Sequence, residues 1–108
     1  MALRAIWTRV AREAEVPPGC AKLVMAGTRE IALFNIGGAL HALANVCPHA
    51  GGPLGEGKFD GREVECPWHY WSFDVATGHC TTFPDVEARC FPVKIEGGDI
   101  FCEIPVKD

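Results

Sequence analysis

Two short segments, each containing a cysteine, a proline and a histidine, constrain this 108-residue chain more than any other feature. The first segment carries Cys47 and His49, the second carries Cys66 and His69, and 16 residues separate the two. Thiolate and imidazole side chains together suit zinc, copper or iron. The prolines, and the glycines that follow the first segment, are typical of tight turns. The four side chains therefore predict a metal site built from two loops.

The mixed composition of each segment narrows the kind of metal site. A zinc finger or ribbon usually separates a Cys-x-x-Cys pair from a histidine pair, whereas each segment here offers one ligand of each type. Such pairs suit a binuclear 2Fe-2S centre in which both cysteines bind one iron and both histidines bind the other. A structural zinc-binding module with the same four ligands, or a redox or iron sensor acting through a partner, stays open at this point.

The residues around these ligands resemble the two cluster-binding loops of the Rieske-type ferredoxins. Residues 47–54, CPHAGGPL, and residues 66–74, CPWHYWSFD, carry the resemblance. It implies a Rieske-type 2Fe-2S cluster whose inner iron is held by two thiolates and whose outer iron is held by two imidazoles. The implied ligands are Cys47, Cys66, His49 and His69. Tyr70 departs from the pattern, because such proteins commonly have glycine there, so the backbone is less open or the ring lies over the cluster edge.

The other two histidines are not expected to be ligands, because neither has a cysteine beside it. His41 falls within a predicted strand, where a partly buried structural role is the simpler interpretation. His79 follows Thr77 and Gly78 in a predicted turn and is expected to be exposed.

The resemblance also implies a function. It predicts a soluble one-electron carrier that passes electrons from an NAD(P)H-dependent flavoprotein reductase to a terminal aromatic-ring oxygenase. The chain has no nucleotide-binding fingerprint and no 2-His-1-carboxylate motif, and it is too short for a substrate domain, so we expect an electron-transfer protein rather than an enzyme. The alternative within the same class is a small Rieske-like subunit of an assimilatory nitrite reductase.

Length and charge exclude several other classes. A chain of 108 residues suits one domain, residues 1–108, with a cluster-binding subdomain at about 46–84. The net charge of −4 and the lack of a basic cluster argue against nucleic acid. No apolar run reaches the roughly 20 residues of a membrane span, and no secretory signal is evident, so we expect a cytoplasmic protein with no membrane partner. The remaining thiols, expected to be free and mostly buried in a reducing compartment, are Cys20, Cys80, Cys90 and Cys102.

Alternating apolar residues and frequent turn signals predict an all-β fold, an antiparallel sandwich or barrel of the Rieske-like type. Gly37 and Gly38 predict a two-residue type I′ hairpin, and residues 11–15 are expected to be a loop. Pro92 must lie at a strand edge or a bulge, because it has no amide hydrogen. The resemblance implies that residues 83–85 shield the cluster. The predicted strands and hairpins cover residues 3–10, 20–25, 30–36, 39–44, 58–66, 71–75, 86–95 and 99–104.

The resemblance makes two further points about the cluster. Respiratory Rieske subunits carry an extra cysteine in each loop, and the corresponding positions here are Gly52 and Trp68, which cannot form that disulfide. High-potential Rieske proteins carry Ser and Tyr donors at the positions of Trp71 and Phe73, and Phe73 has no donor. We therefore expect a reduction potential near the lower end of the Rieske range.

Overall fold

The computed structural model describes residues 3–48, 51–68, 70–83 and 85–107. These residues form ten β-strands and two 3-10 helices, and no α-helix occurs among them. The expected all-β class is therefore confirmed. No helix in the described part of the chain is long and apolar enough to cross a membrane.

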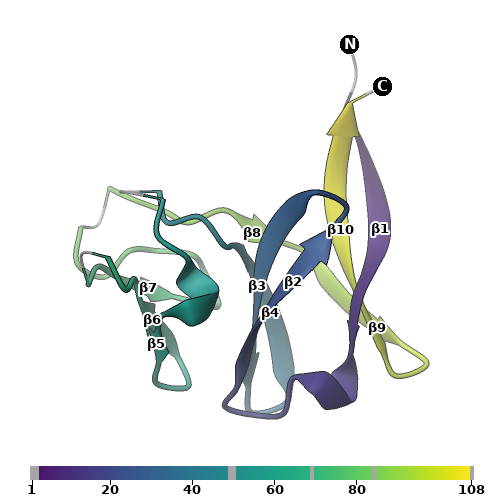
Figure 1. Ribbon diagram of the computed structural model, residues 1–108, viewed down its shortest axis with the longest axis horizontal. Helices are drawn as coiled ribbons and strands as arrows, with labels where there is room; N and C mark the ends of the chain where they lie inside the picture. The colour runs from purple at the N-terminus through teal and green to yellow at the C-terminus, as the bar shows by residue number, and fades with distance from the viewer. Residues whose placement is uncertain (1–2, 49–50, 69, 84, 108) are drawn as a thin grey trace.

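The strands form three antiparallel sheets (Figure 1). The first sheet has the order β1-β10-β9, the second β2-β3-β4-β8, and the third β5-β6-β7. The third sheet and its loops lie on the side of the second sheet away from the long β1–β10 ribbon (Figure 1). In chain order the strands are β1 (Leu3–Arg12), β2 (Ala21–Ala26), β3 (Arg29–Ile36), β4 (Ala39–Ala44), β5 (Lys58–Phe59), β6 (Glu63–Glu65), β7 (Ser72–Asp74), β8 (Cys90–Phe91), β9 (Val93–Glu96) and β10 (Asp99–Lys107).

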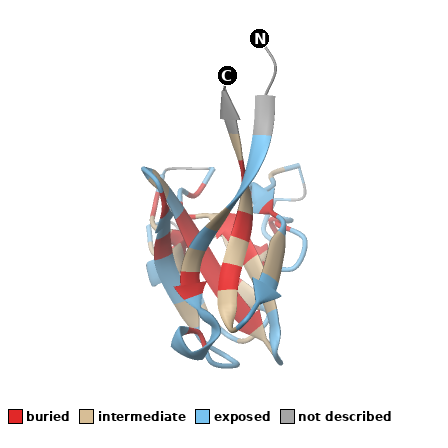
Figure 2. Cartoon of the chain, turned by 90° about the vertical axis from the view of Figure 1, so that its right-hand side faces the viewer, coloured by how far each residue is buried: buried red, intermediate tan, exposed pale blue. Residues whose placement is uncertain are grey.

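The core has two parts that share strand β3. Ile31 and Leu33 pack between the first and second sheets, whereas Ala32 and Phe34 pack between the second sheet and the third. Figure 2 shows buried and exposed positions interspersed along the strands. Because successive side chains of a strand point to opposite faces, a strand between two cores must be apolar at every position. This explains the continuous apolar run in β3.

Two expectations need correction near the ends of the chain. The single strand expected at residues 86–95 is interrupted at Pro92, so that β8 pairs with β4 while β9 pairs with β10. Proline has no amide hydrogen for the ladder, and the strand changes sheets there. Residues 11–15 were expected to form a loop, but β1 continues to Arg12 before a 3-10 helix, η1 (Glu13–Glu15).

The four extra thiols are all free, as predicted, but only two of them are buried. Cys80 and Cys102 are buried, but Cys20 and Cys90 are exposed, and none of the six cysteines forms a disulfide. Cys102 lies opposite Val93 in the sheet rather than opposite Cys90. Burial raises the pKa of the Cys102 thiol to about 11, so this thiol stays protonated and inert near neutral pH.

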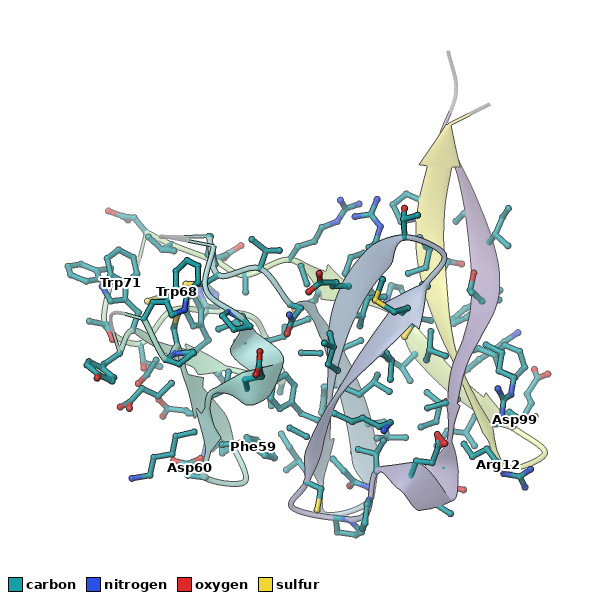
Figure 3. All side chains as sticks on the ribbon, in the orientation of Figure 1. Arg12, Phe59, Asp60, Trp68, Trp71 and Asp99 are labelled. Carbon is teal, nitrogen blue, oxygen red and sulfur yellow. The ribbon has the colours of Figure 1, made fainter. Side chains whose placement is uncertain are left out.

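The hairpin turns follow the glycine and aspartate signals. Gly37 and Gly38 both have positive φ, 57° and 100°, as a type I′ turn requires. Between β5 and β6, the side-chain oxygen Oδ1 of Asp60 accepts hydrogen bonds from the amides of Arg62 at 2.9 Å and Glu63 at 2.7 Å. Figure 3 shows Asp60 at the tip of this hairpin. These two donors hold the pKa of the Asp60 carboxyl below its ordinary value of 3.8.

We expect the charged form of Asp60 to stabilise the hairpin tip. Because its pKa is lowered in the folded protein, this contribution is present above the ordinary pKa and is lost as the pH falls through the folded value. Carbonyl NMR titration should give a pKa below 3.8. Asp60→Asn, which keeps an acceptor but not the charge, should remove this pH dependence, and a titration at or above the ordinary value would contradict the assignment.

Candidate metal centre

Two loops at one end of the molecule carry the predicted ligands. The first loop runs from the end of β4 to η2 (Leu54–Glu56), and the second joins β6 to β7. Cys47 and Cys66 are each 1% exposed and belong to the same cluster of buried residues. His49 and His69 lie outside the described residues, so the structure brings together the two predicted thiolate ligands and does not test the two imidazoles.

The two loops close on their cysteines by the same pair of main-chain hydrogen bonds. In the first, the Cys47 amide donates to the Gly52 carbonyl and the Gly51 amide donates to the Cys47 carbonyl, both at 2.8 Å. In the second, the Cys66 amide donates to the Trp71 carbonyl at 2.8 Å, and the Tyr70 amide donates to the Cys66 carbonyl at 2.9 Å. Each cysteine is thereby fixed at the start of a six-residue closed loop.

The shared hydrogen bonds explain the unusual backbone at Tyr70. The fifth residue of each closed loop has positive φ, which is 79° at Gly51 and 62° at Tyr70. Glycine adopts this conformation freely and asparagine tolerates it, whereas a bulky residue such as tyrosine is destabilised by about 1–2 kcal/mol. Tyr70 is 68% exposed. The backbone turn that glycine usually makes is thus retained here despite a bulky side chain.

The first and second loops are in direct contact. A Cβ atom added to Gly52 would lie 2.7 Å from Cys66 Sγ, closer than real Cβ atoms approach their neighbours, and 3.0 Å from Trp68 Cγ, tighter than most real Cβ contacts. Glycine is therefore needed at position 52 for the two loops to meet. Gly52 and Trp68 are also the positions at which the resemblance places a disulfide in respiratory Rieske subunits, and the contact shows that they are adjacent here without thiols.

The donor chemistry of these loops fits an iron–sulfur cluster. Both cysteines are buried, held by main-chain bonds and not paired in a disulfide, and thiolates are the ligands that iron–sulfur clusters use. Among residues 3–48, 51–68, 70–83 and 85–107, no group of three or more His, Cys, Asp or Glu side chains is placed to hold a metal ion. The two predicted histidine ligands, His49 and His69, fall in the gaps of these ranges.

A buried asparagine anchors the first loop to the second sheet. Asn45 is 2% exposed. Its Nδ2 donates to Glu30 Oε1 at 3.0 Å, and its Oδ1 accepts from the Gly55 amide at 2.7 Å. Its main chain also bonds to Glu30 and to Leu54. These bonds join the two ends of the loop that contains Cys47.

We expect Asn45→Ala to destabilise the protein by about 1–3 kcal/mol, because the Gly55 amide loses its acceptor inside the protein. Loss of visible cluster absorbance during urea titration would measure the effect. The matched control is Asn35→Ala, since Asn35 is also buried and bonds to Val16 and Gly38 through its side chain, far along the chain from the loops. Only the Asn45 variant should lose its cluster faster under native conditions; equal loss in both would contradict the anchoring role.

A third loop, which joins β7 to β8 and contains Phe83, packs beside the second loop. The Phe83 ring lies 4.2 Å, centroid to centroid, from the Trp71 ring, and the Phe83 amide donates to Cys80 Sγ at 3.3 Å. Phe73 is fully buried in the same group of apolar residues as Cys47 and Cys66, the two predicted thiolate ligands. The structure places Phe83 against Trp71 of the second loop. That residues 83–85 shield the cluster stays a prediction, and Pro84 lies outside the described residues.

The two histidines outside the loops lie where the sequence suggested. His41 is half-buried in β4, and His79 is exposed, with Nδ1 3.4 Å from Glu87 Oε1. Neither belongs to a group of potential ligands in the described part of the chain.

A comparison with protein families identifies the class. Residues 6–97 match the model of the Rieske [2Fe-2S] domain. The chain belongs to this family and carries a Rieske [2Fe-2S] cluster, which decides against the zinc module. It is an electron carrier, as the sequence resemblance predicted.

Individual relatives narrow the class to ferredoxin components. The chain is 35% identical over 91 residues to the "Naphthalene 1,2-dioxygenase system, ferredoxin component" of Pseudomonas aeruginosa, covering 83% of this chain and 88% of the relative. It is 40% identical over 94 residues to the "3-phenylpropionate/cinnamic acid dioxygenase ferredoxin subunit" of Escherichia coli K12, covering 85% and 88%.

Solved structures agree with these relatives. A chain in the "Complex of reduced oxygenase and oxidized ferredoxin in carbazole 1,9a-dioxygenase" has a TM-score of 0.81 and 30% identity, covering 90% of this chain and 92% of that one. A Mycobacterium tuberculosis protein described as an NADH-dependent nitrite reductase small subunit has a TM-score of 0.79 and 26% identity, covering 94% and 96%.

Proposed function

We propose that this chain accepts single electrons from an NAD(P)H-dependent flavoprotein reductase and passes them to a terminal aromatic-ring oxygenase. The observation that carries the proposal is the 35–40% identity to dioxygenase ferredoxin components over more than four-fifths of both chains. The complex between a similar ferredoxin and its oxygenase supports the acceptor. The donor's requirement for NAD(P)H is the reason to place the pathway in the cytoplasm.

We propose that Cys47 and Cys66 hold one iron and that His49 and His69 hold the other. The burial of both cysteines supports an inner, thiolate-bound iron. Pro48, Trp68 and Tyr70, the described neighbours of the two histidines, are all exposed, which supports an outer, imidazole-bound iron near the surface.

The domain boundaries belong to the same proposal. Residues 1–108 form one domain, in which the second sheet supports a cluster-binding subdomain at about 46–84. The position of the third sheet and both loops within that range supports this division. The match of the family model across residues 6–97 supports a single domain.

The bound cluster supplies a site that takes up and releases one electron. The chain's own residues determine how that site meets water and partners. Phe73 and the other buried apolar side chains exclude water from the two cysteines. The side chains at the loop tips remain exposed. Such an arrangement suits brief docking through a small surface rather than an obligate interface.

The ligand set can be tested residue by residue. Replacing His49 or His69 by Ala should abolish the native Rieske electron paramagnetic resonance spectrum, because each supplies an essential bond. His41→Ala and His79→Ala, made as controls, should leave the spectrum and the red-brown colour in place. An unchanged spectrum in either loop variant would remove that residue from the ligand set.

A nitrite reductase subunit is the second candidate, supported by the 26% identity to the Mycobacterium tuberculosis protein. The electron acceptor separates the two functions. The reduced protein should transfer electrons to an aromatic-ring oxygenase, and transfer only to a nitrite reductase would overturn the leading proposal.

We expect a potential near the lower end of the Rieske range, about −150 mV rather than about +300 mV. Phe73 offers no hydroxyl donor to a sulfur, and such hydrogen bonds stabilise the reduced cluster. Phe73→Tyr should raise the midpoint potential measured by voltammetry, because Phe73 belongs to the same group of buried side chains as Cys47 and Cys66. Phe101→Tyr in β10 is the control and should not. A midpoint well above zero in the unmodified protein would contradict both the low potential and the oxygenase assignment.

A further inference from the structure

The closed second loop requires positive φ at position 70, but it does not require a tyrosine there. Among the described residues Tyr70 is the one non-glycine residue with positive φ, at 62°. Its counterpart in the first loop is Gly51, which makes the same main-chain hydrogen bond without strain. Strain of this kind persists where the side chain has a use that outweighs it. Glycine would adopt the same backbone conformation without strain. We therefore look for the role of this residue in its side chain.

The Tyr70 side chain is largely exposed on the described chain. It is 68% exposed, and it makes no hydrogen bond or ring contact with the rest of the described residues. Trp71, the next residue, is by contrast partly buried and stacks on Phe83. A residue whose backbone is strained and whose side chain is exposed does not stabilise the isolated protein, so stability does not explain why Tyr70 is a tyrosine.

Other large apolar side chains are exposed at the same end of the molecule. Trp68 from the second loop is 55% exposed, and Phe83 from the third loop is 45% exposed. We call these two residues and Tyr70 the apolar collar. Figure 3 shows Trp68 and Trp71 together at the loop end, on the side away from the β1–β10 ribbon. Exposed aromatic residues grouped in this way mark interaction surfaces, where Tyr and Trp often dominate binding.

We infer that Tyr70 is a specificity-determining contact residue for the terminal oxygenase, and that its strained backbone holds the ring out as the most exposed part of the collar. The inference rests on the proposed function. The fitting partner surface is an apolar depression that can receive a phenol ring and accept its hydroxyl hydrogen. Two of the three collar residues, Trp68 and Tyr70, belong to the second loop, where they flank the proposed ligand His69 in the chain.

The oxygenase is the favoured occupant because a chain of the same fold, 30% identical to this one, is found in a complex of ferredoxin with oxygenase. The competing role for the ring is to shield the cluster from water. The two roles differ in what they change. A shield would alter the potential and the rate of air oxidation, whereas a docking residue alters the rate of transfer to the partner and leaves the potential in place.

The test uses the cluster-loaded protein and three variants of Tyr70. Tyr70→Gly and Tyr70→Asn both remove the ring and tolerate positive φ, while Tyr70→Phe keeps the ring and removes the hydroxyl. The reduced proteins are mixed by stopped flow with aromatic-ring terminal oxygenases, beginning with that of naphthalene 1,2-dioxygenase. Potentials are measured by voltammetry, and thermal stability is followed through the cluster absorbance.

We expect Tyr70→Gly to raise the apparent Tm by about 4 °C, because backbone strain is released. The second-order rate constant for oxygenase reduction should fall about tenfold, as is typical of an interface hot spot, with the potential unchanged. Tyr70→Asn should slow transfer equally, and Tyr70→Phe should slow it less. Trp7→Ala, which removes a side chain 37% exposed on β1, should leave the rate unchanged.

Equal rates in Tyr70→Gly and the unmodified protein would overturn the inference while leaving the proposed function intact. A potential shift large enough to explain the slower transfer would assign Tyr70 to shielding instead. If the Tyr70 variants accept electrons from the reductase more slowly but reduce the oxygenase at the unmodified rate, the assignment of Tyr70 to the oxygenase contact is wrong. If the unmodified protein reduces none of the oxygenases, the proposed function itself fails, and the inference fails with it.

Discussion

The structure depends on the main-chain hydrogen bonds that close each loop on its own cysteine. In both loops the cysteine amide bonds to a carbonyl five residues later, and its carbonyl accepts an amide from four residues later. This places Cys47 and Cys66 in similar main-chain settings. The contact of Gly52 with the second loop then sets the separation of the two sites. A cluster held at fixed distances needs this preorganisation, because misplaced ligands weaken metal binding.

The rest of the fold supports these loops from one side. Strand β3 is buried on both faces, so it joins the core beneath the β1–β10 ribbon to the core that contains the cysteines. Asn45 makes four hydrogen bonds, two to Glu30 in strand β3 and two to Leu54 and Gly55 at the other end of the first loop. These bonds tie both ends of the loop to the sheet. The third loop covers the second loop through the Trp71–Phe83 contact. Stability therefore comes from the sheets, while the loop tips remain exposed for a partner.

Tyr70 shows how stability and function separate in such a site. Every other residue with positive φ in the described chain is a glycine, which fits the general rule that folds avoid strain. One exception, at an exposed position beside a proposed ligand, is the pattern expected where a side chain serves a partner rather than the fold. The nearby collar residues share that exposure without the strain.

The sequence alone determined the all-β class, most strands, the glycine turns and the identity of the proposed ligands, because alternation, turn residues and ligand spacing are local signals. It did not reveal the sheet switch at Pro92 or the exposure of Cys20 and Cys90, since both depend on which sheet each segment joins. The role of Asn45, the contact between Gly52 and Trp68, and the matching of Gly51 with Tyr70 were likewise decided by tertiary structure. These features are hydrogen bonds and close contacts between segments distant in the chain, or between two loops compared in space. No local pattern of residues encodes them.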